Sequence, residues 1–271
     1  MSAHNGDNGV TDTIVLIHGL WVTALSWEHW IERFRARGYS VLAPNWPGMD
    51  VEVEQLRRDP SAIAGLGITE IVDHYDRIIR ELDRPPIIIG HSVGGLSAQI
   101  LLDRGLGAAG VAIASAPVKG VLRLPFSMLR LGPSALHNPA NRHRTVALTP
   151  KQFHHAFTNT VGVQEAAAMH ERYSVPGPCR TVLEVGLANF ARDAVTHVDR
   201  ENDKRAPLLL LAGGKDRIFP AAVTRYNFEL YRKSKAVTAY KEFPDRSHYT
   251  IGEPGWEEVA DYALTWALES A

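Results

Sequence analysis

The chain has 271 residues, of which 45% are hydrophobic and 22% charged, and its formal net charge is −1 at pH 7. This composition is that of an ordinary soluble globular protein, and the charge gives no general attraction to nucleic acid or to an anionic membrane surface. A single cysteine, Cys179, cannot form an internal disulfide, which excludes disulfide-rich secreted scaffolds. The first twelve residues are polar and no stretch has 18 consecutive apolar residues, so we expect a cytoplasmic protein with no leader and no membrane span.

Short apolar runs alternate with amphipathic stretches along the chain. Each run is too short for a helix and apolar nearly throughout, as expected of strands that are covered on both faces. The runs are TIVLIHG from Thr13, YSVLAP from Tyr39, PIIIGHS from Pro86, GVAIASAP from Gly110, PLLLLAGG from Pro207 and AVTAYKEFP from Ala236.

Three intervening stretches carry the signals of helices. Ser26 and Thr69 are each predicted to cap a helix, the first of which runs to Arg37 with Gly38 as its terminator, and a third helix is predicted from Trp256 to Glu269. Strands that alternate with helices imply right-handed crossover connections. We therefore predict an α/β fold with a doubly wound, mainly parallel sheet of about six strands and helices on both faces.

The stretch from Val118 to Arg205 breaks this alternation. It contains helical pieces, several prolines and no convincing strand, so we interpret it as a helical cap inserted into a core of residues 1–117 and 206–271. The cap carries 12 Lys plus Arg against 7 Asp plus Glu, which leaves open an attraction for a substrate with a carboxylate. One group of its apolar residues either packs within the cap or forms an acyl pocket: Leu122, Leu124, Phe126, Met128, Leu129 and Leu131.

The sharpest motif lies directly after the third apolar run. Gly90-His91-Ser92-Val93-Gly94 fits the pattern G-x-S-x-G, with an apolar strand before it and a small-residue helix after it. A serine in such a turn takes a strained backbone conformation, and the flanking glycines let neighbouring backbone approach it closely. We therefore predict that Ser92 is a nucleophile and that the adjacent His91 points away from the reaction centre.

Two later loops contain the groups that could activate this serine. A serine hydroxyl needs a base to take its proton, and the base needs an acidic group to orient it. Asp216 directly follows the predicted strand after Pro207, and His248 lies in the loop before the last helix. Asp245, in the same loop as His248, is the alternative acid, but it does not follow a strand end, so Asp216 is preferred.

Acyl transfer also needs hydrogen-bond donors for the developing oxyanion. The backbone N–H of Val93 is the first candidate, because it directly follows the serine. The second should come from the loop after the first strand, where His18-Gly19 ends the apolar run. We predict the N–H of Leu20, with that of Trp21 as the alternative.

The segments IVLIHG, APNWPG, IIIGHSVGG, LAGGKD and a final SHY resemble the α/β-hydrolase superfamily over nearly the whole chain outside the cap. The first strand begins at about Thr13, which leaves no room for the usual first hairpin. The resemblance is therefore to compact six-stranded members, such as the plant methylesterase and hydroxynitrile lyase branch and related bacterial esterases, here with an enlarged cap. It implies a serine carboxylesterase that needs no cofactor and acts on a small-molecule ester, with the order Ser92, Asp216, His248 typical of this fold.

Other activities are compatible with the same residues. They are thioesterase, lactonase, amidase, perhydrolase or hydroxynitrile lyase chemistry, or a non-catalytic small-molecule receptor of the same fold. Gly105, Gly107 and Gly110 fit a dinucleotide-binding pattern but follow a helix and precede a strand, which favours a turn. His154-His155 lacks the spacing of metal ligands, so we predict no metal, and nothing indicates a nucleic-acid partner or a particular oligomeric state.

Overall fold

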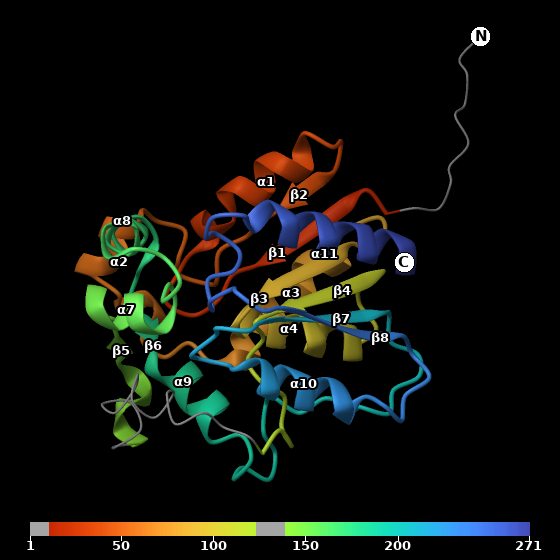
Figure 1. Cartoon of the computed structure of the whole chain (residues 1–271). Coiled ribbons are helices and arrows are strands. Elements are labelled where there is room, and N and C mark those ends of the chain that lie inside the picture. Colours follow the sequence, from red (N-terminus) through yellow and green to blue (C-terminus); the bar gives the residue numbers. More distant parts are fainter. Residues whose placement is uncertain (1–10, 123–138) are drawn as a thin grey trace.

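The computed structural model describes residues 11–122 and 139–271. Its main sheet has six strands, all parallel, in the order β2-β1-β3-β4-β7-β8 (Figure 1). The strands are β1 (Thr13–Ile17), β2 (Ser40–Leu42), β3 (Ile87–His91), β4 (Ala109–Ile113), β7 (Leu208–Gly213) and β8 (Thr238–Phe243). All six apolar runs therefore form strands, and the predicted α/β fold is confirmed.

Helices cover both faces of this sheet (Figure 1). Helices α1 (Glu28–Arg35) and α11 (Trp256–Ser270) lie together over one face, where Arg33 forms two hydrogen bonds of 2.6 and 2.7 Å with Asp261. Over the other face lie α3 (Ile68–Arg80), α4 (Val93–Asp103) and α10 (Ala221–Leu230). The sheet is thus buried between two helical layers, as its almost entirely apolar central strands require.

Two predicted helix starts are wrong. A 3-10 turn, η1 (Ala24–Trp27), precedes α1, and its cap is Thr23, while Ser26 is buried and donates its hydroxyl to the Thr23 carbonyl. Helix α3 begins one residue before Thr69, and its first N–H, that of Ile68, donates to the Glu184 carboxylate at 2.7 Å. The cap of this helix therefore comes from a residue 116 positions away, which no local pattern could indicate.

The part of the chain between β4 and β7, which we call the cap, adds no strand to the main sheet within its described residues. It contains η3 (Pro139–His143), α7 (Pro150–Ala156), α8 (Val163–Tyr173) and α9 (Cys179–Gly186). The expectation of no strand is wrong, because β5 (Thr145–Val146) and β6 (Gly177–Pro178) pair in an antiparallel ribbon. The division into residues 1–117, 118–205 and 206–271 stays an interpretation, and the predicted apolar residues from Leu124 to Leu131 lie outside the described residues.

Polar contacts join the cap to α1, α2 (Val53–Arg58) and the segment before α3, which contains η2 (Ser61–Ile63). Arg57 donates to the carbonyls of His170 and Ser174 at the end of α8, at 3.0 and 2.9 Å. Thr181 of α9 donates to the Leu66 carbonyl at 3.0 Å. Figure 1 places these cap elements together at one end of the sheet. No helix in the described ranges is long and apolar enough to cross a membrane.

Candidate active site

The strand order places two loops side by side. The chain runs from β1 to β2 on one side and then returns to β3 on the other side of β1, so the direction of winding reverses between β1 and β3. In open parallel sheets, ligands bind beyond the carboxyl ends of the strands at such a reversal. Leu20 follows β1 and Ser92 follows β3, with Ile17 and Gly90 in register, so both predicted site residues lie at this point.

Ser92 has φ 55° and ψ −117°, a conformation that non-glycine residues rarely adopt and that costs about 1–3 kcal/mol. Its backbone is held on both sides, because its N–H donates to the Ile113 carbonyl and its carbonyl accepts from the Ala116 N–H, both at 2.9 Å. The turn also needs Gly94, since a Cβ there would lie 2.1 Å from the Ile17 carbonyl oxygen. The motif therefore fits a sharp turn packed directly against the end of β1.

Asp216 and His248 are in direct contact. The Asp216 Oδ2 lies 2.8 Å from the His248 Nδ1, and both side chains are fully buried. The other carboxylate oxygen accepts the N–H groups of Ile218 and Phe219 at 2.7 and 2.9 Å, which fixes the carboxylate plane. The alternative acid, Asp245, is exposed to solvent, so the structure brings Asp216 and not Asp245 to the histidine.

The contact with Asp216 determines the tautomer of His248. A carboxylate only accepts hydrogen bonds, so Nδ1 carries the hydrogen and Nε2 carries the lone pair. Nε2 is buried and has no partner among the described residues. The ring is held edge-to-face against Phe157, with centroids 4.9 Å apart, and tilted against Phe219 at 5.7 Å. His248 is therefore an imidazole ring that is held in place by its neighbours, with its Nε2 left without a partner among the described residues.

His91 does not point away from the reaction centre as expected, because its ring lies beside His248. Its ring centroid lies 4.9 Å from that of His248, and its Nε2–H donates to the His248 carbonyl at 2.8 Å. Burial lowers the pKa of His91 well below its ordinary value, and the nearby His248 lowers it further. His91 is thus a neutral donor that holds the backbone of the histidine loop.

The two predicted oxyanion donors flank the serine. Neither the N–H of Leu20 nor that of Val93 has an acceptor within the described residues. A Cβ on Gly19 would lie 2.9 Å from the Ser92 Cβ, so the loop after β1 runs directly beside the serine. His18 shapes this loop, because its Nδ1–H donates to the Gly19 carbonyl at 2.9 Å while its Nε2 accepts the Trp46 N–H at 3.2 Å.

A small pocket lies at Ser92, with a cavity volume of about 20 Å³. Its walls come from the loop after β1, the turn at Ser92, helix α9 and the segment after Asp216, and they are almost entirely apolar. The lining residues are Leu20, Trp21, Ser92, Val93, Thr181, Val182, Val185, Ile218 and Phe219. Trp46 lies outside this pocket and stacks on His18, with centroids 4.7 Å apart, and Leu122, one of the residues predicted for an acyl pocket, is 73% exposed instead.

Sequence reasoning missed the wall formed by α9. The apolar face of α9 that lines the pocket consists of Val182 and Val185. The neighbouring Thr181 also lines the pocket, and its hydroxyl donates a hydrogen bond to the Leu66 carbonyl. The spacing of three residues between the valines was a helical signal, but nothing local placed that face against Ser92. Ile218 and Phe219 were detectable only as the residues that follow the predicted acid.

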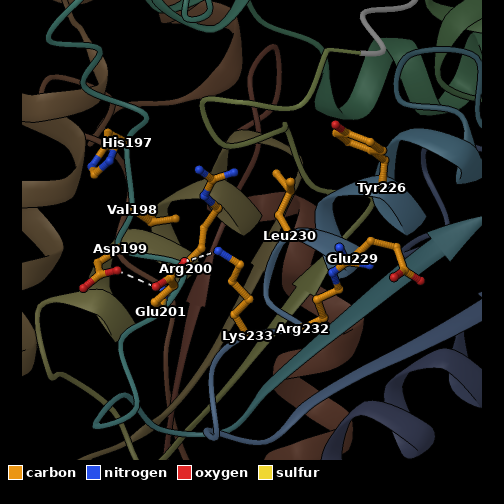
Figure 2. Close-up of a pocket in the computed structure, with 10 residues that line it drawn as sticks. All are labelled: His197, Val198, Asp199, Arg200, Glu201, Tyr226, Glu229, Leu230, Arg232 and Lys233. Carbon is orange, nitrogen blue, oxygen red and sulfur yellow. Dashed lines mark hydrogen bonds and ion pairs between the residues drawn. The ribbon is translucent and has the colours of Figure 1, made fainter.

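A second, more open depression lies elsewhere, between the loop at 197–201 and the end of α10, and Figure 2 shows its lining side chains. Both signs of charge line it, and Lys233 pairs with Glu201 at 2.9 Å. None of the predicted site residues lies there. Within the described residues, no group of three or more His, Cys, Asp or Glu side chains is arranged to hold a metal ion.

Residues 14–262 match the family described as the alpha/beta hydrolase family. Among solved structures, a monoacylglycerol lipase of Paleococcus ferrophilus is 22% identical with a TM-score of 0.67, over 97% of this chain and 96% of that one. A pyrethroid hydrolase from Sphingobium faniae JZ-2 is 18% identical (TM-score 0.67; 95% and 97% covered), and a methylesterase from Arabidopsis is 14% identical (TM-score 0.64; 94% and 98% covered). A search of curated protein sequences gave no match. The chain belongs to the alpha/beta hydrolase family, and its structural neighbours include esterases and lipases.

Proposed function

We propose that the protein is a cofactor-independent serine hydrolase that cleaves small or medium carboxylic esters through an acyl-enzyme. The observation that carries this proposal is the buried Asp216–His248 pair, 2.8 Å apart, with the free lone pair of Nε2 on a ring held in place. Serine acyl transfer needs an oriented base and a nucleophile close to it. His248 supplies the base, and the strained turn that neighbours the histidine loop supplies Ser92.

The first half of the reaction forms the acyl-enzyme. The Ser92 Oγ attacks the ester carbonyl carbon as His248 Nε2 takes the hydroxyl proton, which gives a tetrahedral intermediate with a negative oxygen. The N–H groups of Leu20 and Val93 bind that oxygen. The bond to the alkoxy oxygen then breaks, His248 returns its proton to the leaving alcohol, and the acyl group stays on Ser92.

The second half releases the acid. Water attacks the acyl carbon while His248 takes one of its protons, and the second tetrahedral intermediate collapses with return of that proton to the Ser92 Oγ. Asp216 keeps the histidine in the reactive tautomer and stabilises its positive charge in both halves. The products are the carboxylic acid and the alcohol, and the enzyme is regenerated.

The pocket lining favours an uncharged, apolar acyl group. No charged side chain lines the pocket among the described residues, and burial of an unpaired carboxylate beside these walls would be costly. This argues against the substrate with a carboxylate that the cationic cap left open. Several structural neighbours, including a monoacylglycerol lipase and a methylesterase, are named for ester chemistry, which supports the proposal. A cytoplasmic location stays a prediction from the sequence.

The test labels the purified protein with a fluorophosphonate and locates the adduct by peptide mass mapping, followed by a series of p-nitrophenyl esters of increasing chain length. We expect the adduct on Ser92 and turnover of short or medium esters. Ser92→Ala should abolish both, whereas Ser97→Ala, a buried serine on the same helix, should retain both. Labelling without turnover would indicate another acyl chemistry or a receptor, and no labelling would contradict the proposal.

The same assay separates the two candidate acids. Asp216→Asn should lower kcat by about 10³–10⁴, because the amide no longer fixes the reactive tautomer of His248. Asp245→Asn, on the same loop as the histidine but exposed, should change kcat little. The reverse result would assign the acidic role to Asp245.

A further inference from the structure

Trp21, the residue after Leu20, has an unusual backbone conformation. Its φ is 68°, in the left-handed region, which a bulky non-glycine residue rarely adopts. A bulky residue keeps such a conformation only where its surroundings impose it. Among the described residues, the hydrogen bonds of Trp21 are made with the cap, and its ring contact is with Phe157 of the cap.

The cap ribbon, which we define as β5 and β6 with the adjoining Val175, holds Trp21 at both ends. The indole N–H of Trp21 donates to the Val146 carbonyl of β5 at 3.0 Å. Its backbone carbonyl accepts the Val175 N–H at 2.9 Å. The ribbon also packs tightly, since a Cβ on Gly177 would lie 2.9 Å from the Leu20 Cδ1 and 3.1 Å from the Trp21 Cδ1.

The other end of the oxyanion loop, residues 18–21, is fixed by the core. His18 donates to the Gly19 carbonyl at 2.9 Å. In a trans peptide the N–H points opposite to the carbonyl of the same unit, so this bond also fixes the direction of the Leu20 N–H. Leu20 therefore lies between two fixed points, the Gly19 carbonyl held by His18 of the core and Trp21 held by the cap ribbon.

We propose that Trp21 is a positioning residue that makes the oxyanion-binding geometry of the Leu20 N–H depend on the cap ribbon. The inference rests on the proposed function, in which this N–H binds the oxyanion. It assigns the cap a role beyond enclosing the substrate, because the ribbon completes the part of the centre that binds the transition state. Loss of the indole anchor should weaken binding of the tetrahedral intermediate while ground-state binding stays the same.

Trp21→Phe is the test, since it keeps an aromatic ring at this position and removes the indole donor together with the rest of the five-membered ring. With p-nitrophenyl butyrate, we expect kcat per active site to fall about 10-fold with an unchanged KM, less than the 10²–10³ that loss of an oxyanion donor costs. Affinity for butylboronic acid, whose serine adduct places an oxygen at the oxyanion position, should fall in parallel. The fraction of active sites is measured by fluorophosphonate titration, so incomplete folding does not enter the comparison.

The matched control is Trp27→Phe. Trp27 is also fully buried, but it lies outside the pocket and its indole nitrogen has no hydrogen-bond partner among the described residues. This variant should keep kcat and boronate affinity. If Trp21→Phe does not fold, Gly177→Ala presses on the same loop from the cap side, and a fall in kcat at constant KM is again expected.

Two results would overturn the inference. In the first, Trp21→Phe keeps kcat and boronate affinity per active site. In the second, only KM rises, which would make Trp21 a simple wall of the pocket. Both are distinguishable from failure of the proposed function, in which Ser92→Ala would retain hydrolysis in the same assay.

Discussion

His18 is a buried histidine that works only in its neutral form. Its Nε2 accepts the Trp46 N–H while its Nδ1–H donates to Gly19, and a protonated ring could not accept. Burial lowers its pKa to about 4, although hydrogen bonds to the Gly19 and Val22 backbone partly oppose this. Protonation of His18 would therefore break the contact with Trp46 and disturb the loop that carries Leu20.

The free energy of unfolding should depend on pH through this residue. Between the unfolded pKa of about 6.5 and the folded pKa of about 4, His18 is protonated in the unfolded chain and neutral in the folded chain. The contribution of His18 to the free energy of unfolding is thus fully present above pH 6.5. It is lost as the pH falls towards 4, by roughly 3 kcal/mol. Urea unfolding at several pH values measures this slope.

His18→Asn removes the titrating ring and retains a donor for the Gly19 carbonyl. The variant should be less stable at pH 7 but should lose less stability between pH 6.5 and 4 than the parent protein. His197→Asn, which changes an exposed histidine, is the control and should leave the slope unchanged. Equal slopes for the parent and His18→Asn would contradict the assignment.

At the scale of elements, the end of α8 depends on one arginine from α2. The last carbonyls of a helix have no partners within the helix and carry a partial negative charge. The Arg57 guanidinium donates to the carbonyls of His170, Glu171 and Ser174, and thereby fastens α8 to the core. At the same end of α8, Arg172 and Tyr173 both donate hydrogen bonds to the Glu28 carboxylate of α1. The hydrogen bond from Arg172 lowers the pKa of Glu28.

Arg57→Ala should therefore destabilise the protein by about 2 kcal/mol, because charge-assisted hydrogen bonds to three carbonyls are lost at once. Its neighbour Arg58 pairs with Glu54 on the surface, at 3.3 Å, and makes no other polar contact with the described part of the chain, so Arg58→Ala should change stability by less than about 0.5 kcal/mol. Thermal unfolding compares the two variants. Limited proteolysis should also cut the cap of Arg57→Ala faster, and equal resistance in both variants would mean that other contacts hold α8.

The surroundings of each element determine whether it could be predicted from the sequence. The four inner strands β1, β3, β4 and β7 were readable because each is buried on both faces, so that its run of apolar residues is a local signature, whereas the edge strands β2 and β8 are only partly buried. The helix starts were not, because the N–H of Ile68 is capped by Glu184 from the cap rather than by the nearby Thr69. The ribbon of β5 and β6 was missed since two-residue strands that contain Gly177 and Pro178 have no alternating pattern.

At the scale of the molecule, the candidate centre lies where the core meets the cap. Ser92, Asp216 and His248 were predictable because each follows a strand of the core, and parallel strands bring their carboxyl ends to one edge. The wall formed by Val182 and Val185 was not predictable, because its position depends on how α9 packs against the core. The positions of the three candidate residues are thus encoded locally, whereas the shape of the pocket is encoded by long-range packing.

This division predicts that a change in α9 alters substrate choice and leaves the chemistry intact. Val182→Phe adds bulk to the pocket wall and should exclude long acyl chains, because each methylene that a pocket accepts or rejects is worth about 1–3 kcal/mol. For p-nitrophenyl esters, we expect kcat/KM for octanoate to fall at least about 10-fold relative to acetate, while fluorophosphonate still labels Ser92. Leu187→Phe, at the exposed end of the same helix, should leave the ratio unchanged. A uniform loss for all chain lengths with Val182→Phe would mean that α9 supports the reactive groups rather than the acyl chain, because only a steric wall discriminates by length.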